Sequence, residues 1–277
     1  MPELPEVETV KETLTQLIKG KEIKEVTITW PKIIKRPDDQ EAFRTLIHGQ
    51  TIHEITRRGK FLKFHLDDLV LVSHLRMEGR YEMSDGQEAD KHTHVRFLFT
   101  DGTELRYRDV RKFGTMHLFE KGTEETALPL AQLGPEPLTP DFTPEVLKRA
   151  FEKTTRNVKA VLLDQKAVAG LGNIYVDEAL FKAGIRPNAK ASTLHHEELV
   201  RLHQTIVETL QEAVDKGGSS VRSYVNSKGD MGMFQLHLYV YGRQGEECRN
   251  CMTPIEKLVV AGRGTHFCLD ASQKNKC

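Results

Sequence analysis

The pattern of apolar positions predicts one helix followed by a series of strands in the first half of the chain. Apolar side chains at helical spacing cover residues 6–19, and Gly20 stands where a helix would end in a left-handed residue. Short segments rich in Val, Ile, Thr, Leu and Phe follow, at 23–30, 51–57, 60–66, 69–75, 93–99, 103–108 and 114–119. Asp101-Gly102 is typical of a hairpin turn. We therefore expect an antiparallel β-sandwich with an N-terminal helix.

A proline-rich stretch over 122–144 separates these strands from a helical part and predicts an interdomain linker. Helices are expected at 144–152, 155–166, 173–183 and 195–216, a loop at 217–235, and strands at 236–241 and 256–260. The predicted fold class is α+β. Its domains are a sandwich at 1–130, a helical domain at 131–235 and a C-terminal part at 236–277.

Charge and hydropathy narrow the class of protein. Lys+Arg and Asp+Glu both number 40, so the net charge is zero. Zero net charge argues against a polycation that coats nucleic acid by bulk charge, but it does not exclude a locally basic groove. The mean hydropathy is −0.47, and the longest apolar run, 69–75, is too short to span a bilayer. Glu3, Glu6 and Glu8 have the wrong charge for a signal peptide. We expect a cytoplasmic protein with no membrane association.

All four cysteines lie near the end of the chain, at Cys248, Cys251, Cys268 and Cys277. A secreted disulfide scaffold would spread its cysteines along a short chain. A terminal cluster that begins with Cys-x-x-Cys favours a metal site.

The first residues allow two interpretations. Removal of Met1 would expose the secondary amine of Pro2, and an α-amino group has a pKa of about 8, so part of it is neutral at pH 7. A neutral amine can attack a sugar C1′ and form an iminium, with Glu3 moving protons beside it. Alternatively, Pro2 and Pro5 only start a helix, which local sequence alone favours.

Motifs along the whole chain resemble bacterial formamidopyrimidine-DNA glycosylases. In order they are Met1-Pro-Glu-Leu-Pro-Glu-Val-Glu-Thr9, Arg57-Arg-Gly-Lys60, Ser73-His-Leu-Arg-Met-Glu-Gly79, Tyr107-Arg-Asp-Val-Arg-Lys-Phe-Gly114, Leu133-Gly-Pro-Glu-Pro137, Val168-Ala-Gly-Leu-Gly-Asn-Ile-Tyr-Val-Asp-Glu178 and Val240-Tyr-Gly-Arg243. Leu4, where the endonuclease VIII family usually has Gly, favours the purine-lesion branch.

The resemblance implies an enzyme that is both a DNA glycosylase and an abasic-site lyase of base excision repair. Its substrates would be 8-oxoguanine and formamidopyrimidines, flipped out of duplex DNA. Pro2 would be the nucleophile on C1′ and Glu3 the general acid/base, with β- and δ-elimination following. Lys60 would assist at the lesion phosphate; taken alone, its Arg-Arg-Gly-Lys turn favours a solvated basic turn.

The resemblance also implies a set of DNA contacts: Met77, His92, Arg111, Phe113, Lys153 and Asn173. Met77, Arg111 and Phe113 would fill the gap left by the flipped base, although Met77 and Phe113 alone would more often be core residues. His92 and His94 would share one face of a strand, but lack a third metal ligand. Arg156 and Lys159 could add to the phosphate contacts. The loop 217–235 would close over the extruded purine.

The family ends in a β-hairpin that binds one Zn²⁺, and here the sequence departs from the pattern. Cys248, Cys251 and Cys268 match three ligands, and Arg263 at the turn would bind the lesion phosphates and assist δ-elimination. The fourth cysteine is replaced by Ala271, and a knuckle glycine is replaced by Met252, which we expect to be strained.

Several alternatives stay open at the end of the chain. Cys277, His266, water or nothing could complete the zinc site. One inserted nucleotide could restore Cys-Pro-Arg-Cys-Gln after residue 267, so the terminus could be a frameshift product. An endonuclease VIII-like enzyme for oxidised pyrimidines and a non-catalytic damaged-DNA-binding protein are the alternative functions, and a retained Met1 would support the latter. The resemblance implies a monomer on damaged double-stranded DNA.

Overall fold

The computed structural model describes residues 1–84, 86–219 and 232–270. The chain divides into two compact units. Unit 1 comprises Met1–Ala131 and Gly217–Met233, and unit 2 comprises Gln132–Lys216 and Phe234–Cys277. Of the predicted 217–235 loop, Gly217–Met233 therefore groups with the N-terminal unit and the last two residues group with unit 2. The three-domain division at 1–130, 131–235 and 236–277 stays a prediction.

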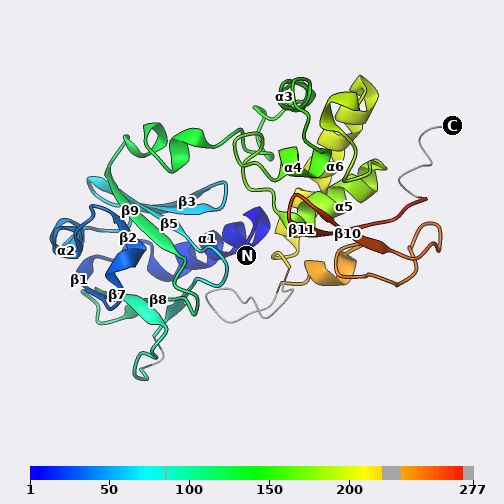
Figure 1. Cartoon of the computed structure of the whole chain (residues 1–277). Coiled ribbons are helices and arrows are strands. Elements are labelled where there is room, and N and C mark those ends of the chain that lie inside the picture. Colours follow the sequence, from blue (N-terminus) through cyan, green and yellow to red (C-terminus); the bar gives the residue numbers. More distant parts are fainter. Residues whose placement is uncertain (85, 220–231, 271–277) are drawn as a thin grey trace. The chain divides into compact units, whose positions relative to one another are not determined.

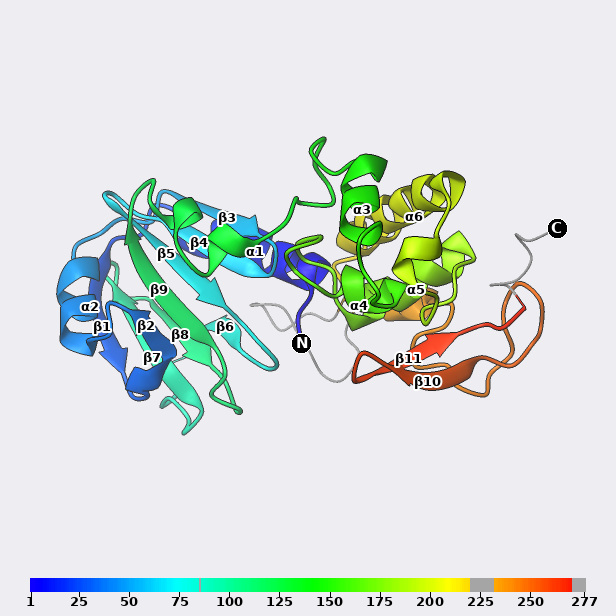
Figure 2. The same ribbon diagram turned by 45° about the horizontal axis from the view of Figure 1, so that its top comes forward.

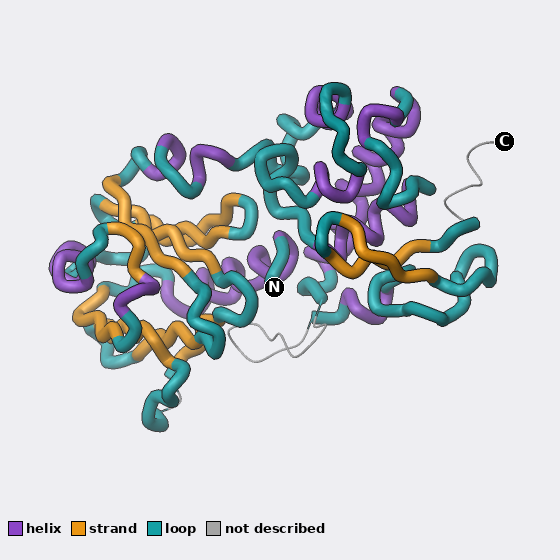
Figure 3. Tube along the Cα trace, in the orientation of Figure 1, coloured by secondary structure: helices purple, strands orange, loops and turns teal. Residues whose placement is uncertain are grey.

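Unit 1 contains two sheets, seen as two groups of strands in Figure 3. Its elements are α1 (Leu4–Ile18), β1 (Ile23–Ile28), β2 (Ile34–Arg36), α2 (Gln40–Ile47), β3 (Glu54–Arg58), β4 (Phe61–His65), β5 (Leu69–His74), β6 (Arg80–Met83), β7 (Thr93–Phe99), β8 (Glu104–Arg108) and β9 (Thr115–Glu120). One sheet has the order β1-β7-β8-β6 and the other β2-β9-β5-β4-β3. The predicted sandwich with an N-terminal helix is confirmed.

The helix α1 packs its apolar stripe into the core that the two sheets share (Figures 1 and 2). Val7, Val10 and Leu14 of this stripe are buried, because their spacing places them on one face. Gly20 follows the helix with φ of +81°, the left-handed conformation expected after a helix end.

Three elements of unit 1 have no counterpart among the predicted ones. The helix α2 buries only Phe43 and Ile47, one turn apart, which is too short a period to recognise. The strands β2 and β6 have three and four residues, too few for an alternating pattern. Because β2 pairs parallel with β9, the sandwich is not wholly antiparallel as expected.

Two neighbouring connections pass from one sheet to the other. Residues 75–79 join β5 to β6, and residues 109–114 join β8 to β9. The strands β5 and β9 pair in one sheet, and β6 and β8 pair in the other. Since His74 is opposite Thr115 and Arg80 is opposite Arg108, both connections leave the sheets at the same end.

Unit 2 is a helical domain with a β-hairpin packed against it (Figure 1). Its elements are α3 (Pro144–Phe151), α4 (Val158–Leu162), α5 (Asn173–Ala183), α6 (His196–Asp215), β10 (Glu256–Val260) and β11 (Arg263–Phe267). All four predicted helices are present, and the α+β class with a C-terminal hairpin is confirmed. In the described part of the chain, every helix falls short of the length or apolarity that a bilayer crossing demands.

The prediction of a strand at 236–241 is wrong. Phe234–His237 forms a short 3-10 helix, and turns follow it. The apolar residues that suggested a strand include Leu238 and Val240, which are buried. The backbone N–H groups of residues 239–241 point at one carboxylate instead of at a neighbouring strand.

Candidate functional site

Pro2 and Glu3 immediately precede α1, and both are buried. Glu3 caps the helix: its side chain accepts the backbone N–H of Glu6, while its own N–H donates to Glu6 Oε2 at 2.8 Å. Glu6 Oε1 accepts the backbone N–H of Ser219 at 2.7 Å. This geometry fits both interpretations of the first residues, as a helix start and as a nucleophile. The reason is that the capping hydrogen bonds fix the position of the residues that precede the helix.

Lys60 lies in the two-residue turn between β3 and β4, next to Gly59 at φ of +58°. Lys60 is only 5% exposed, so the interpretation of this segment as a solvated basic turn is wrong. Arg57 ties this turn to α1, because its Nε donates to Glu8 at 2.7 Å and its Nη1 to the Gly59 carbonyl at 2.9 Å. Burial acts to raise the pKa of Glu8, but hydrogen bonds from Lys11 and Arg57 lower it overall. The start of α1 and the turn that carries Lys60 are therefore held together.

The two sheet connections expose large apolar side chains at their tips. Met77 is 39% exposed and Phe113 is 51% exposed, so the core interpretation of both is wrong. The guanidinium of Arg111, also exposed, lies 4.7 Å from the centre of the Phe113 ring. Residues 75–79 and 109–114 leave the sheets together, so the structure brings these three predicted residues to one end of unit 1.

His92 and His94 do not share a face. His92 is half-buried and precedes β7, whereas His94 is buried and its Nε2 donates to the Asp109 carbonyl at 2.8 Å. The reason is an irregular register between Thr93 and Val95, which breaks the alternation. Among the described residues, the only possible three-ligand metal cluster is formed by cysteines elsewhere in the chain.

In unit 2, Asn173 begins α5 and Arg263 follows the turn of the C-terminal hairpin. Asn173 Nδ2 donates to the carbonyl of Gly264 at 3.0 Å, so the helix start and the hairpin turn are joined. The turn residues Ala261 and Gly262 have φ of +51° and +70°, and Arg263 is exposed. Asn173 and Arg263 are thus brought close, whereas Lys153 is exposed on the segment that follows another helix, α3.

Lys159 is not a surface phosphate contact as expected. It is fully buried, and its Nζ donates to Asp177 Oδ1 at 2.6 Å. Asp177 Oδ2 accepts the backbone N–H of His266 in β11 at 2.9 Å. A buried charge requires a partner, so Lys159 supports the carboxylate that holds the hairpin. Arg156 is instead exposed and pairs with Asp164 at 2.9 Å.

Glu178, next to Asp177, holds the segment that leads into the cysteines. It accepts the backbone N–H groups of Tyr239, Val240 and Tyr241 at 2.8–2.9 Å. Burial raises its pKa, and these N–H groups oppose that effect. Sequence reasoning missed both carboxylates. The available signal was an acidic pair inside a helix that is otherwise almost wholly apolar, which requires buried partners.

The sulfur atoms of Cys248, Cys251 and Cys268 lie within 4.8 Å of one another. The Cys251 and Cys268 sulfurs are 3.4 Å apart, and the Cys248 sulfur accepts the Asn250 N–H at 3.4 Å. Three converging sulfurs suit Zn²⁺, which prefers tetrahedral thiolate sites. Cys277 and Ala271 lie outside the described residues.

Met252, which follows the knuckle, has φ of +64°. The expectation that this position needs a left-handed residue is therefore confirmed, and a methionine there carries backbone strain.

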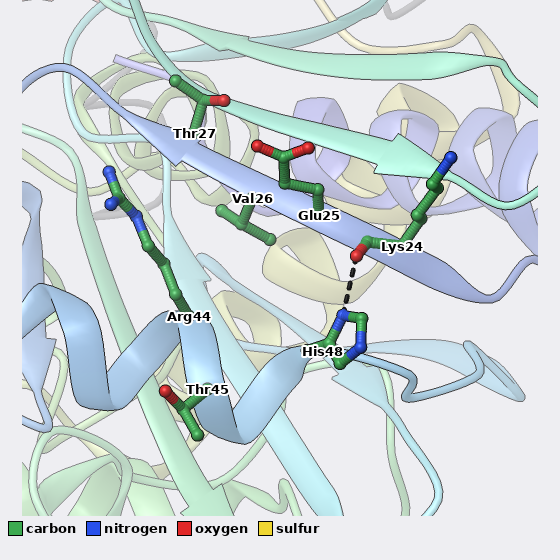
Figure 4. Close-up of a pocket in the computed structure, with 7 residues that line it drawn as sticks. All are labelled: Lys24, Glu25, Val26, Thr27, Arg44, Thr45 and His48. Carbon is green, nitrogen blue, oxygen red and sulfur yellow. Dashed lines mark hydrogen bonds between the residues drawn. The ribbon is translucent and has the colours of Figure 1, made fainter.

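A surface hollow of unit 1 lies between α2 and β1, away from all the predicted residues (Figure 4). Its lining includes Lys24, Arg44 and His48, and His48 Nδ1 contacts the Lys24 carbonyl at 2.7 Å. Arg44 is already paired with Glu41. The hollow therefore offers no catalytic cluster.

Comparisons with known proteins agree with the geometry. Family models match over residues 1–116 (formamidopyrimidine-DNA glycosylase N-terminal domain), 133–225 (formamidopyrimidine-DNA glycosylase H2TH domain) and 245–269 (zinc finger found in FPG and IleRS). The formamidopyrimidine-DNA glycosylase of Bacillus licheniformis is 62% identical over 99% of this chain and all of the relative, and that of Bacillus subtilis is 61% identical with the same coverage.

A solved structure gives the same result. The Lactococcus lactis Fpg, in complex with DNA that contains an abasic site, superposes with a TM-score of 0.92. It is 42% identical, and the match covers 98% of this chain and 99% of the Lactococcus lactis chain. The fold, the order of motifs and the relatives lead to one conclusion: this chain belongs to the formamidopyrimidine-DNA glycosylase family.

Proposed function

We propose that the chain is a bifunctional DNA glycosylase and abasic-site lyase that removes oxidised purines from duplex DNA in base excision repair. Family membership over the full chain supports the glycosylase activity. The observation that carries the mechanism is the buried start of α1, where Pro2 and Glu3 directly precede the helix that Arg57 ties to the Lys60 turn.

The proposed reaction begins after removal of Met1. The Pro2 nitrogen attacks C1′ of the flipped nucleotide, a bond forms from nitrogen to C1′, and the bond from C1′ to the base breaks as the base takes up a proton. An α-amino group has a pKa of about 8, so part of the Pro2 amine is neutral and nucleophilic at pH 7. The nitrogen then loses its proton, and its lone pair expels O4′: the bond from C1′ to O4′ breaks, O4′ takes up a proton and an iminium forms at C1′. The iminium makes the C2′ proton acidic, so the 3′ phosphate leaves by β-elimination and the 5′ phosphate by δ-elimination. Glu3 carries protons in these steps.

DNA binding requires contacts to the phosphates and side chains that occupy the space left in the base stack by the flipped nucleotide. We assign phosphate contacts to Lys60, His92, Lys153, Asn173 and Arg263. Arg263 also assists δ-elimination. The exposed Met77, Arg111 and Phe113 enter the stack, with Arg111 facing the orphaned cytosine. The partner is damaged double-stranded DNA, bound by a single chain on the nucleoid.

Borohydride trapping on a duplex with 8-oxoguanine opposite cytosine tests this mechanism. We expect a covalent adduct that disappears in Pro2→Gly and in protein that retains Met1, because both lack the secondary amine. A matched G:C duplex is the control. No adduct from protein whose N-terminus is confirmed as Pro2 would contradict the proposal. Preference for oxidised pyrimidines in a lesion panel would instead indicate the endonuclease VIII-like activity.

For the metal, we propose that Cys248, Cys251 and Cys268 hold one zinc ion and that water fills the fourth position. Bound zinc would fix the hairpin that carries Arg263. Three thiolates bind zinc less tightly than a closed set of four. The Co²⁺ spectrum should therefore show three thiolate ligands in wild type and in Cys277→Ser, and four in Ala271→Cys. Loss of one thiolate in Cys277→Ser would assign the fourth ligand to Cys277.

A further inference from the structure

A single buried carboxylate organises the loop that carries Arg111 and Phe113. Asp109 is 0% exposed and is the first residue of the connection 109–114. Its Oδ1 accepts the N–H of Arg111 at 3.0 Å. Its Oδ2 accepts the N–H groups of Phe113 at 2.9 Å and Gly114 at 2.8 Å. Within the described parts of the chain no basic side chain forms an ion pair with Asp109, so backbone N–H groups balance its charge.

The backbone of Asp109 joins this loop to the other predicted DNA contact of unit 1. Its N–H donates to the His92 carbonyl at 2.9 Å. Its carbonyl accepts the N–H of Lys112 at 3.3 Å and Nε2–H of the buried His94 at 2.8 Å. The three residues His92, Arg111 and Phe113 therefore depend on one anchoring residue.

The neighbouring connection, 75–79, is packed against the same anchor region. A Cβ atom added at Gly79 would lie 2.1 Å from the Tyr107 hydroxyl oxygen, and one added at Gly114 would lie 1.8 Å from it. Both distances are too short for a side chain to fit. Both connections thus close tightly around Tyr107, two residues before Asp109. The loop that carries Met77 and the loop that carries Phe113 are consequently held as one surface.

Hydrogen bonds to this anchor, more than hydrophobic burial, hold the tip of the loop, where Lys112 Nζ also lies 4.2 Å from the centre of the Trp30 ring. Val110 and Phe113 are 45% and 51% exposed, so hydrophobic burial does not fix them. Lys112 adopts φ of +59°, which is unfavourable for a side chain with a Cβ. Hydrogen bonds to an ionised, buried carboxylate are about twice as strong as neutral ones. They can hold an exposed apolar tip in one conformation before DNA binds.

We propose that Asp109 is a positioning residue that preorganises Arg111 and Phe113 for insertion into the DNA stack. The inference rests on the proposed function, because it requires that these side chains replace the flipped nucleotide. Asp109 is fully buried, so we assign it no direct contact with the substrate. Because Asp109 orders the loop before DNA binds, the base-flipping step does not include the entropic cost of ordering it. Asp109 also holds Arg111 in the position from which it contacts the opposite base.

The test compares Asp109→Asn with two reference variants. An asparagine keeps the volume but replaces one acceptor oxygen by an NH₂ group, so at least one loop N–H loses its partner. Asp101→Asn is the matched control, since Asp101 also caps a loop, through the Thr103 N–H at 2.9 Å, but in the hairpin between β7 and β8. Phe113→Ala shows the effect of removing the inserted ring itself.

Three measurements separate positioning from general damage. Single-turnover excision from the 8-oxoguanine:cytosine duplex should fall about tenfold to a hundredfold in Asp109→Asn, as for the loss of charge-assisted hydrogen bonds. Strand cleavage at a preformed abasic site in single-stranded DNA should stay within about twofold, because no stack must be opened. The preference for cytosine over adenine opposite the lesion should decrease, and 2-aminopurine beside the lesion should report less base flipping. Asp101→Asn should match wild type throughout.

Equal loss on the duplex and on the single strand would overturn the proposal, since that pattern indicates general destabilisation. No loss on either substrate would also overturn it. The proposed function is checked separately by the wild-type protein: absence of its borohydride adduct on the abasic strand contradicts the catalytic mechanism. An unchanged Phe113→Ala together with an active wild type would contradict the stack-insertion role on which Asp109 depends.

Discussion

The loop 109–114 of unit 1 and the β-hairpin of unit 2 are both fixed by buried carboxylates that accept backbone N–H groups. In unit 1, Asp109 bonds to residues two, four and five positions ahead. In unit 2, Glu178 bonds to residues 61 to 63 positions ahead, and Asp177 bonds to His266, 89 positions ahead. One anchor is local in sequence and the other joins distant segments.

This difference matters for how each region responds to damage. The Asp109 loop closes on itself, so losing its anchor releases a few residues while both sheets remain paired. The Asp177 and Glu178 contacts join α5 to the hairpin and to the segment before the cysteines. Their loss detaches a subdomain, and loss of Asp177 also removes the carboxylate that balances the buried charge of Lys159. We therefore expect larger stability effects in unit 2 and more selective functional effects in unit 1.

The largest effect is expected from Lys159→Met, which leaves the Asp177 carboxylate buried without its cation. Removing one partner of a buried pair costs about 3–5 kcal/mol. Urea unfolding of the full-length protein measures the loss. Lys216→Met is the control, because its pair with Glu212 at 2.7 Å is partly exposed and contributes no more than about 1 kcal/mol. Similar losses in the two variants would contradict the structural role of Lys159.

A pH effect is expected next, from His74 at the start of the connection 75–79. Burial, followed by the charges of Arg76, Lys60 and His117, lowers its pKa to about 3. The unfolded chain, with a pKa of about 6.5, takes up the proton first, so stability is lost as pH falls from 6.5 toward 3. The slope approaches about 1.4 kcal/mol per pH unit.

His74→Gln isolates this contribution. A glutamine keeps an acceptor for the Arg76 N–H, which His74 Nδ1 accepts at 2.9 Å, but cannot titrate. The difference in unfolding free energy between wild type and variant should shift in favour of the variant as pH falls from 7 to 5. A difference that stays constant over this range would show that His74 is not held neutral.

A smaller loss, about 1–3 kcal/mol, is expected from Glu178→Gln. The amide keeps one acceptor oxygen but turns its NH₂ group toward a backbone N–H. The matched control is Glu198→Gln at the start of α6, where glutamine serves equally well in a capping box. Thermal unfolding compares the two variants, and a Glu198→Gln effect as large as that of Glu178→Gln would contradict the anchoring role.

The smallest effect is a gain, from Met252→Gly. Glycine adopts φ of +64° without the Cβ penalty of about 1 kcal/mol that methionine carries. The variant should bind zinc more tightly, by up to about tenfold in a competition titration with a chelator. Asn250→Gly, at a position without positive φ, should bring no gain. Weaker zinc binding in Met252→Gly would show that the knuckle does not need this conformation.

The catalytic assignment is a prediction that rests on residue identity at fixed places in known motifs. Pro2, Glu3 and Lys60 were proposed this way and stay predictions as catalytic residues, whereas the burial of Lys60 excludes the solvated turn that local sequence favours. The strain at Met252 was also predictable, since glycine is common at such a turn position because it adopts positive φ without strain. The prediction that Lys159 contacts phosphate at the surface was wrong. The sequence around a lysine in one helix does not indicate which aspartate of another helix will pair with it.

The sequence by itself determined the elements whose signal is periodic or local: α1, α5, α6, most of the strands and the cysteines that converge as a cluster. The tertiary structure decided which polar groups are buried and what satisfies them. Asp109, Asp177 and Glu178 acquire their roles only when strands and helices place backbone N–H groups around them. The physical reason is that desolvating a charge is costly unless several partners converge on it, and that convergence is a property of the packed chain.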